Sequence, residues 1–187
     1  MGMLTGLAGG KSQARQPGGP PAGGKRLPPA HLGDLPMRIA QDGTWFYQGS
    51  PINRSSLVKL FASVLHREED GEYWLATPAE RGKIVVEDVP FMAVAVRAEG
   101  AGRDQRLFFR SNLDDEVPLD EAHPLRLASE PATGASIPYI VIRDRLEARI
   151  LRAVFYHLVE FGEQIGEEFG VWSSGRFFPL GRLDSVR

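Results

Sequence analysis

Short runs of hydrophobic residues, bounded by glycine, proline and polar residues, recur along most of the chain. Runs of this length that are rich in β-branched and aromatic residues are typical of β-strands. Few of the connections between them resemble strand–helix–strand crossovers, so the strands should pair mainly antiparallel. The expected strands cover residues 37–40, 44–47, 73–75, 83–87, 91–96, 107–110, 117–119, 125–128, 137–143, 169–172 and 177–181.

Two segments show helical spacing of their apolar residues instead. The first follows Asn53, which can cap a helix. Its apolar stripe is formed by Leu57, Leu60, Phe61, Val64 and Leu65. The second is predicted to be longer, because Asp144 and Glu147 match a capping box and apolar residues continue from Leu146 to Phe161. These residues cover more than one narrow stripe, so sheet should surround the second helix over much of its circumference.

Composition narrows the classes of function. The 187 residues are 42% hydrophobic and 25% charged, with a formal net charge of -2, as in ordinary soluble proteins. The absence of cysteine excludes disulfides, thiol nucleophiles and cysteine-bound zinc or iron–sulfur centres. No apolar run approaches the ~18 residues that cross a membrane. We therefore expect a cytoplasmic protein that makes no contact with a membrane.

The first thirty residues differ from the rest. They contain eight glycines, five prolines, four basic residues and no Asp or Glu, so we expect a disordered tail over 1–30. Residues 31–187 hold all 24 acidic residues and 18 basic ones, which gives them a formal charge of −6. A body with this charge is a poor binder of nucleic-acid backbones, and nucleic acid is not an expected partner.

The folded part is expected to comprise two subdomains. Residues 97–104 contain two glycines and no apolar side chain larger than alanine, which is typical of a boundary or of a long hairpin loop. This places the first subdomain at 31–100 and the second at 101–187. Each half combines strands, one helix and a tryptophan-bearing hairpin, although no residue-level repeat relates the two halves.

Six short motifs occur in a recognisable order. They are GKIVVEDVPF at 82–91, SNLDDE at 111–116, HPLR at 123–126, IPYIVIR at 137–143, LEAR at 146–149 and GVWSSG at 170–175. Together they resemble an uncharacterised proteobacterial family of domains of unknown function, over roughly residues 30–185. The resemblance implies an α+β fold of two half-barrel-like subdomains, each a curved, mainly antiparallel sheet around a helix. It also implies a dimer with a ligand-sensing or signal-transduction role, and it supplies no catalytic residues.

Four arginines surround the expected start of the second helix, namely Arg143, Arg145, Arg149 and Arg152. Spacings of 4 and 3 put the last three on one helix face. Such a row requires negatively charged groups nearby, because guanidinium groups are costly to place beside a hydrophobic core without them. One interpretation is a salt-bridge network with acidic residues of the chain, and the other is a pocket for an organic anion. The residues expected to bind that anion are Arg143, Arg149, Arg126, Tyr139, Trp172 and Ser173.

A second group of polar residues is a weaker candidate. Asn112, Asp114, Asp115 and His123 lie close in sequence, and Glu87 and Asp88 complete this polar cluster. Clustered carboxylates can bind Mg²⁺ or Ca²⁺, or can raise one another's pKa for acid–base chemistry. The plainer interpretation is a turn rich in Asn and Asp between two strands. We expect no metal site, because the four histidines are widely separated and no calcium-loop spacing is present.

No nucleophile elbow, phosphate loop or dinucleotide fingerprint is present in the sequence. The leading hypothesis is therefore a non-enzymatic regulatory or signal-transduction module that senses a small anionic metabolite as a cytoplasmic homodimer, without a cofactor. One alternative is a protein–protein adaptor that binds no ligand. The other is an enzyme that uses Asp114 or Asp115 with His123 as partner.

Overall fold

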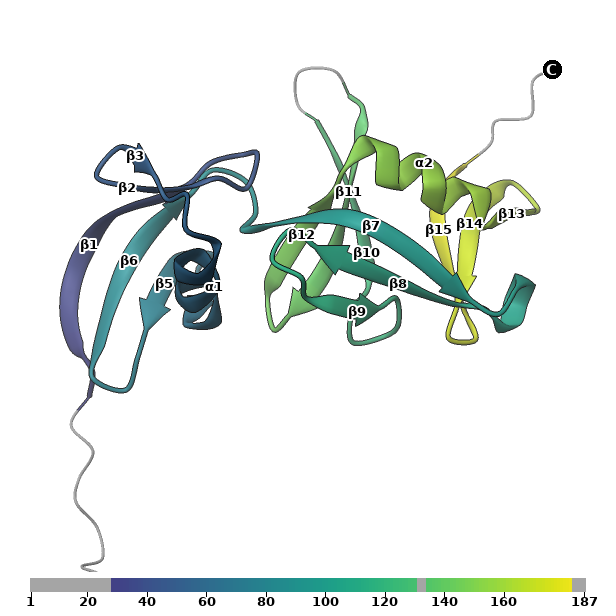
Figure 1. Cartoon of the computed structure of the whole chain (residues 1–187). Helices are drawn as coiled ribbons and strands as arrows, with labels where there is room; N and C mark the ends of the chain where they lie inside the picture. Colours follow the sequence, from purple (N-terminus) through teal and green to yellow (C-terminus); the bar gives the residue numbers. More distant parts are fainter. Residues whose placement is uncertain (1–27, 131–133, 183–187) are drawn as a thin grey trace, which may run out of the picture.

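The computed structural model describes residues 28–130 and 134–182, and most of the predicted tail lies outside them. Three sheets account for most of this part of the chain (Figure 1). Sheet A has the strand order β3-β2-β1-β6-β5-β4. Its strands are β1 (Ala30–Ile39), β2 (Trp45–Tyr47), β3 (Ser50–Pro51), β4 (Leu65–Arg67), β5 (Tyr73–Ala76) and β6 (Glu80–Val86). Helix α1 (Ser55–Ser63) lies on the side of sheet A that faces the rest of the molecule (Figure 1).

Sheet B follows in the chain and is curled into a half-barrel, with the order β10-β11-β12-β7-β8-β9. Its strands are β7 (Phe91–Glu99), β8 (Arg106–Ser111), β9 (Glu116–Pro118), β10 (Leu125–Ser129), β11 (Ser136–Arg143) and β12 (Leu146–Ile150). Helix α2 (Arg152–Glu160) then packs against β7. Sheet C closes the described chain with β13 (Gly162–Ile165), β14 (Glu168–Ser173) and β15 (Arg176–Arg182).

The pairing confirms the expected α+β class with mainly antiparallel strands. Two parallel pairs interrupt this pattern, β1 with β6 and β12 with β7. The chain passes from sheet A to sheet B between Val86 and Phe91. The glycine-containing segment 97–104 includes the end of β7 and a short 3-10 turn (Gly102–Asp104) that leads into β8.

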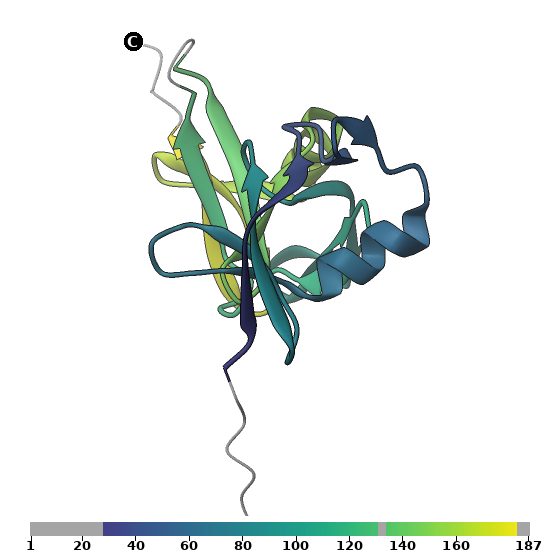
Figure 2. The ribbon, with the colours of Figure 1, turned by 90° about the vertical axis from the view of Figure 1, so that its left-hand side faces the viewer.

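One hydrophobic core extends across both sheets. Ile39 and Trp45 of sheet A belong to the same buried cluster as Phe91 and Phe109 of sheet B. Figure 2 looks at sheet A from its outer side, with β1 and β6 in front and the strands of sheet B behind. Since the halves share buried apolar surface, the hydrophobic effect holds them together and polar contacts at the junction need only fix their orientation.

The second helix is shorter than predicted. Residues 144–150 form a turn and strand β12, and the helix begins only at Arg152, after Leu151. Asp144 has a φ of 48° and occupies the tight β11–β12 turn, so it cannot cap a helix. The sequence from Leu146 to Ile150 also alternates in polarity, and pairing with β11 and β7 selects the strand. The predicted capping box and the shared helix face for the arginines are therefore wrong.

Both helices bury one face only. In α2 the buried side chains are Val154 and Leu158, whereas Tyr156 is 56% exposed, so sheet does not surround this helix.

Helix α1 begins at Ser55, directly after Arg54, and not directly after the predicted cap Asn53. No helix among the described residues is long and apolar enough to cross a membrane.

Candidate functional site

Tyr139 on β11 and Arg149 on β12 are direct cross-strand partners, and both bind Asp88 in the connection between sheets A and B. The Tyr139 hydroxyl donates to the Asp88 carboxylate at 3.0 Å, and Nη1 of Arg149 donates to it at 3.3 Å. Burial, together with the hydrogen bond to Asp88, raises the pKa of Tyr139 to about 12. We call these three residues the joint, because they fix the connection 87–90 to sheet B.

A second ionic group lies beside the joint. Glu147 is buried, and its carboxylate accepts two hydrogen bonds from Arg126, at 2.7 and 2.9 Å. Arg67 of sheet A approaches the same carboxylate at 3.7 Å. The Arg126 guanidinium also lies 4.3 Å from the centre of the Tyr139 ring. Hydrogen bonding to Glu147 raises the pKa of Arg126. The charge of Arg126 is thus neutralised by a carboxylate of the protein itself. Glu147 connects β12 to both β10 and β4.

Two more of the predicted arginines connect sheet B to the first half of the chain. Arg143 donates to the carbonyl of Ala62, in the last turn of α1, and lies 3.9 Å from Asp115. Arg145 binds Glu69 at 2.8 Å on the exposed surface. These arginines therefore belong to the salt-bridge interpretation of the arginine group.

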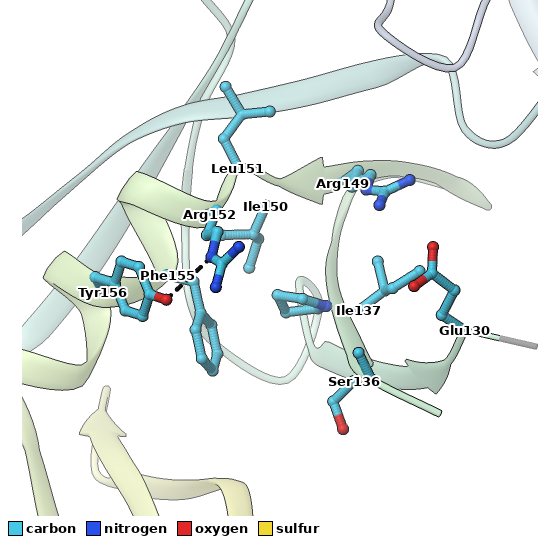
Figure 3. Close-up of a pocket in the computed structure, with 11 residues that line it drawn as sticks. Glu130, Ser136, Ile137, Arg149, Ile150, Leu151, Arg152, Phe155 and Tyr156 are labelled. Atoms are coloured by element: carbon cyan, nitrogen blue, oxygen red, sulfur yellow. Dashed lines mark hydrogen bonds between the residues drawn. The ribbon is translucent and has the colours of Figure 1, made fainter. Parts of the chain in front are cut away.

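A pocket of about 520 Å³ opens between β11, β12 and the first turn of α2 (Figure 3). Its apolar wall is formed by Ile137, Pro138, Ile150, Leu151 and Phe155. Its polar lining comprises Glu130, Ser136, Arg149, Arg152 and Tyr156. In Figure 3 Arg152 lies beside Tyr156, and Arg149 lies beyond Ile150, toward Glu130. The pocket thus combines a mostly apolar surface with two guanidinium groups and one carboxylate, that of Glu130.

Arg152 differs from the other arginines of the group. Its Nε donates to the Tyr156 hydroxyl at 3.0 Å, and it forms no ion pair with any residue that the structure describes. It is also the first residue of α2, whose first turn contains no acidic side chain. The positive end of the helix dipole therefore adds to the charge of Arg152.

Arg149 borders this pocket and two shallower depressions on its other side. These have volumes of about 370 and 580 Å³ and are lined by Gln41 and Glu87 along with Arg149. Glu87 is already bound by Arg38 and by the backbone N–H of Gln41. Arg149 and Glu130 thus border both the pocket of Figure 3 and the acidic groove beside the connection 87–90.

Of the six predicted ligand-binding residues, Arg149 is the one that lines this pocket; Arg126, Arg143 and Tyr139 have the partners given above, and Trp172 and Ser173 lie in another sheet. Ser173 is fully buried, where its hydroxyl donates to the Leu119 carbonyl at 2.6 Å and accepts from the Leu107 N–H at 3.0 Å. Trp172 donates from Nε1 to Glu163 at 2.7 Å. Both residues lie on β14 in sheet C, where their polar atoms hold neighbouring strands and loops in place.

The remaining members of the polar cluster have separate partners. Asn112 accepts a hydrogen bond from the Met92 N–H at 3.0 Å, and Asp115 accepts one from Ser111. Asp114 forms an exposed ion pair with Lys59 at 2.6 Å, and this hydrogen bond lowers its pKa.

The histidine of the polar cluster is also engaged elsewhere. His123 bonds to Asp120 at 3.0 Å, and no contact joins it to Asp114 or Asp115 in the described part of the chain. Residues 112–115 form a turn between β8 and β9 rather than an acid–base pair. No group of three His, Asp or Glu side chains among the described residues could hold a metal ion.

The fold and pocket define an α+β protein of two curved sheets that share a core. The chain belongs to the DUF1285 family: residues 24–89 match its N-terminal domain of unknown function and residues 90–180 match its C-terminal domain. This confirms the resemblance seen in the sequence motifs. Among curated proteins no match was found.

Two crystal structures of DUF1285 family proteins are similar to this one. A protein from Silicibacter pomeroyi DSS-3 is 49% identical, with a TM-score of 0.79, over 83% of this chain and 85% of that one. A protein from Shewanella baltica OS155 is 26% identical, with a TM-score of 0.53, over 67% of this chain and 91% of that one. The family relationship therefore covers both halves of the molecule and leaves its activity open.

Proposed function

We propose that this protein is a non-enzymatic regulatory module that binds a small organic anion with an apolar body in the pocket of Figure 3. The observation that carries the proposal is the placement of Arg152. Its guanidinium has no carboxylate partner in the described chain, and it stands at the edge of a largely apolar pocket. An arginine in this position is suited to a carboxylate or a phosphate, because its planar N–H groups match the oxygen pairs of these anions.

The size of the pocket supports a ligand of metabolite size. Its volume of about 520 Å³ lies within the range of roughly 300–1,000 Å³ that small-molecule sites occupy. Burial of an alkyl chain against Ile137, Pro138 and Phe155 contributes about 0.8 kcal/mol for each methylene group. A charged hydrogen bond to Arg152 adds about 1.5–3 kcal/mol. After the cost of association, these terms support binding in the micromolar to millimolar range.

The proposal is tested with paired ligands that differ only in charge. Octanoate and octyl phosphate are compared with octanamide and octanol by calorimetry and by thermal denaturation of the full chain. The anions should bind and raise the Tm, because ligand binding to the native state stabilises it. Equal binding of charged and uncharged members of each pair, or no binding of the anions, would overturn the proposal.

Matched arginine variants locate the site. Arg152→Gln should weaken octanoate binding at least about fivefold, which corresponds to the loss of roughly 1 kcal/mol of a charged contact. Arg145→Gln is the control, because it removes the same charge from an exposed pair with Glu69 outside the pocket. Equal losses in the two variants would indicate a general charge effect and would contradict a site at Arg152.

The regulatory role that we propose includes a cytoplasmic homodimer. The family membership supports this role only through the resemblance already described, so the oligomeric state needs its own measurement. Light scattering after size-exclusion chromatography, with and without octanoate, provides it. A monomer under both conditions would remove the dimer from the proposal and leave the binding site intact.

A further inference from the structure

We infer that an anion in the pocket draws Arg149 away from Asp88 and thereby loosens the joint between sheets A and B. This inference rests on the proposed function, since it describes how binding at the same site is transmitted. It is based on the position of Arg149, whose guanidinium lines the pocket and also binds Asp88 in the connection 87–90.

The bond between Arg149 and Asp88 is weak for an ion pair. A single nitrogen of Arg149 contacts the carboxylate, at 3.3 Å, whereas charged N–H···O hydrogen bonds are commonly about 2.7–2.9 Å long. Arg126, by comparison, holds Glu147 with two bonds of 2.7 and 2.9 Å. An anion that accepts two hydrogen bonds from Arg149 would therefore be bound more strongly than Asp88, which accepts one long bond, and would compete with Asp88 for the guanidinium.

The negative charge of Asp88 is neutralised by Arg149. Its side chain is 19% exposed, and its bonded partners are Arg149 and the hydroxyl of Tyr139. Two carboxylates, those of Glu87 and Glu130, line the same depression as Asp88, and the carboxylate of Glu87 binds Arg38. Arg126, on the neighbouring strand, is bound by Glu147. When Arg149 turns toward an anion, a largely buried carboxylate keeps one neutral donor and becomes costly to hold in place.

The loosening should be local. The contacts of Arg67 with Glu147, of Arg143 with Ala62 and of Arg145 with Glu69 join the two halves without lining the pocket of Figure 3. They and the shared core keep the sheets together while the connection 87–90 gains freedom. Anion binding in the pocket would thus change the mobility of the connection 87–90, through which the chain passes from sheet A to sheet B.

Coupling of this kind is reciprocal. If an anion weakens the bond to Asp88, then removal of that bond must strengthen anion binding. Asp88→Asn should therefore bind octanoate about fivefold more tightly than the unsubstituted protein, a factor at the lower end of common allosteric couplings. Asp42→Asn is the matched control, because Asp42 lines the groove beside Arg149 but bonds to the N–H of Thr44.

Hydrogen exchange of the unsubstituted protein gives a second readout that needs no variant to fold. Octanoate should slow exchange in α2, beside the bound ligand, and should accelerate it in the segment 86–91. Slower exchange in both segments, or equal octanoate affinities for Asp88→Asn and Asp42→Asn, would overturn the inference and leave the proposed function standing. If octanoate and octyl phosphate bind to none of these proteins, the proposed function fails and the inference fails with it.

Discussion

Tyr139 and Arg149 face each other across β11 and β12, and their side chains hold the same carboxylate, that of Asp88. Two adjacent strands of sheet B therefore fix the connection that leads out of sheet A. The Arg126 guanidinium covers the ring of Tyr139 and binds Glu147, two residues before Arg149 on β12. The joint and the ionic group around Glu147 thus form one continuous polar layer at the junction of the two halves.

We predict that Glu147→Gln destabilises the protein by about 1–3 kcal/mol, because it removes the acceptor of charged bonds from Arg126 and from Arg67. The effect stays below that of a fully buried pair, since the Arg126 side chain is 48% exposed and can turn to solvent. Denaturation by urea measures the free energy of unfolding. Glu69→Gln is the control, because its exposed pair with Arg145 should change this free energy by less than about 1 kcal/mol.

The raised pKa of Tyr139 predicts a loss of stability at alkaline pH. Its folded pKa is about 12 against 10.0 for an ordinary tyrosine, so its contribution is fully present below pH 10 and disappears as the pH rises toward 12. Burial also raises the pKa of Tyr73, which contributes in the same direction. Tyr139→Phe should flatten the dependence of the unfolding free energy on pH above 10.

The measurement for this prediction is urea denaturation at several alkaline pH values, combined with titration of tyrosinate absorbance. Tyr156→Phe serves as the control, because Tyr156 is 56% exposed and its hydroxyl accepts from Arg152 rather than donating to a carboxylate among the described residues. An equal flattening in both variants would show that Tyr139 is not the source of the pH dependence.

Most of the strands were predictable because their side-chain pattern is local. The runs at 37–40, 91–96 and 137–143 lie within β1, β7 and β11 or overlap them. The helix expected from Asp144 onward was wrong because capping residues and apolar spacing there also fit a hairpin. Two alternating runs on either side of Arg143, Asp144 and Arg145 were the signal that would have favoured the hairpin. The stripe of the first helix was also too wide, since Leu60 is 60% exposed.

The site was predictable in part. Arg149 and Tyr139 were expected together as anion-binding residues, whereas Asp88 was assigned to the polar cluster, and the structure brings all three into contact. The pocket residues Phe155 and Tyr156 were missed because the helix was expected to begin too early, which turned the wrong face of it inward. Trp172 and Ser173 were placed wrongly because a sequence pattern does not specify which distant sheet a strand joins.

Gly170 offers a test of packing in sheet C. A Cβ atom at this position would lie 2.4 Å from the Phe178 carbonyl oxygen and 2.9 Å from the Pro179 Cα, both backbone atoms of the neighbouring strand. Gly170→Ala should therefore destabilise the protein by about 1–3 kcal/mol through overpacking. Gly181→Ala, on the paired strand β15, is the control because a Cβ atom there would meet nothing within 4 Å. Comparable unfolding free energies for the two variants would contradict this packing.

The variant Ser173→Ala tests whether Ser173 has a structural role or the ligand-binding role that the sequence suggested for it. Ser173→Ala leaves the Leu107 N–H without its buried side-chain acceptor and leaves the Leu119 carbonyl with the longer bond of 3.4 Å from the Ser174 hydroxyl, so the unfolding free energy should fall by about 1–3 kcal/mol. Ser63→Ala, which removes an exposed hydroxyl from the end of α1, should cost much less. Octanoate affinity measured by calorimetry, at a temperature where both variants are folded, should be the same for each. A selective loss of octanoate binding in Ser173→Ala would mean that sheet C takes part in the site and that the pocket at Arg152 is incomplete.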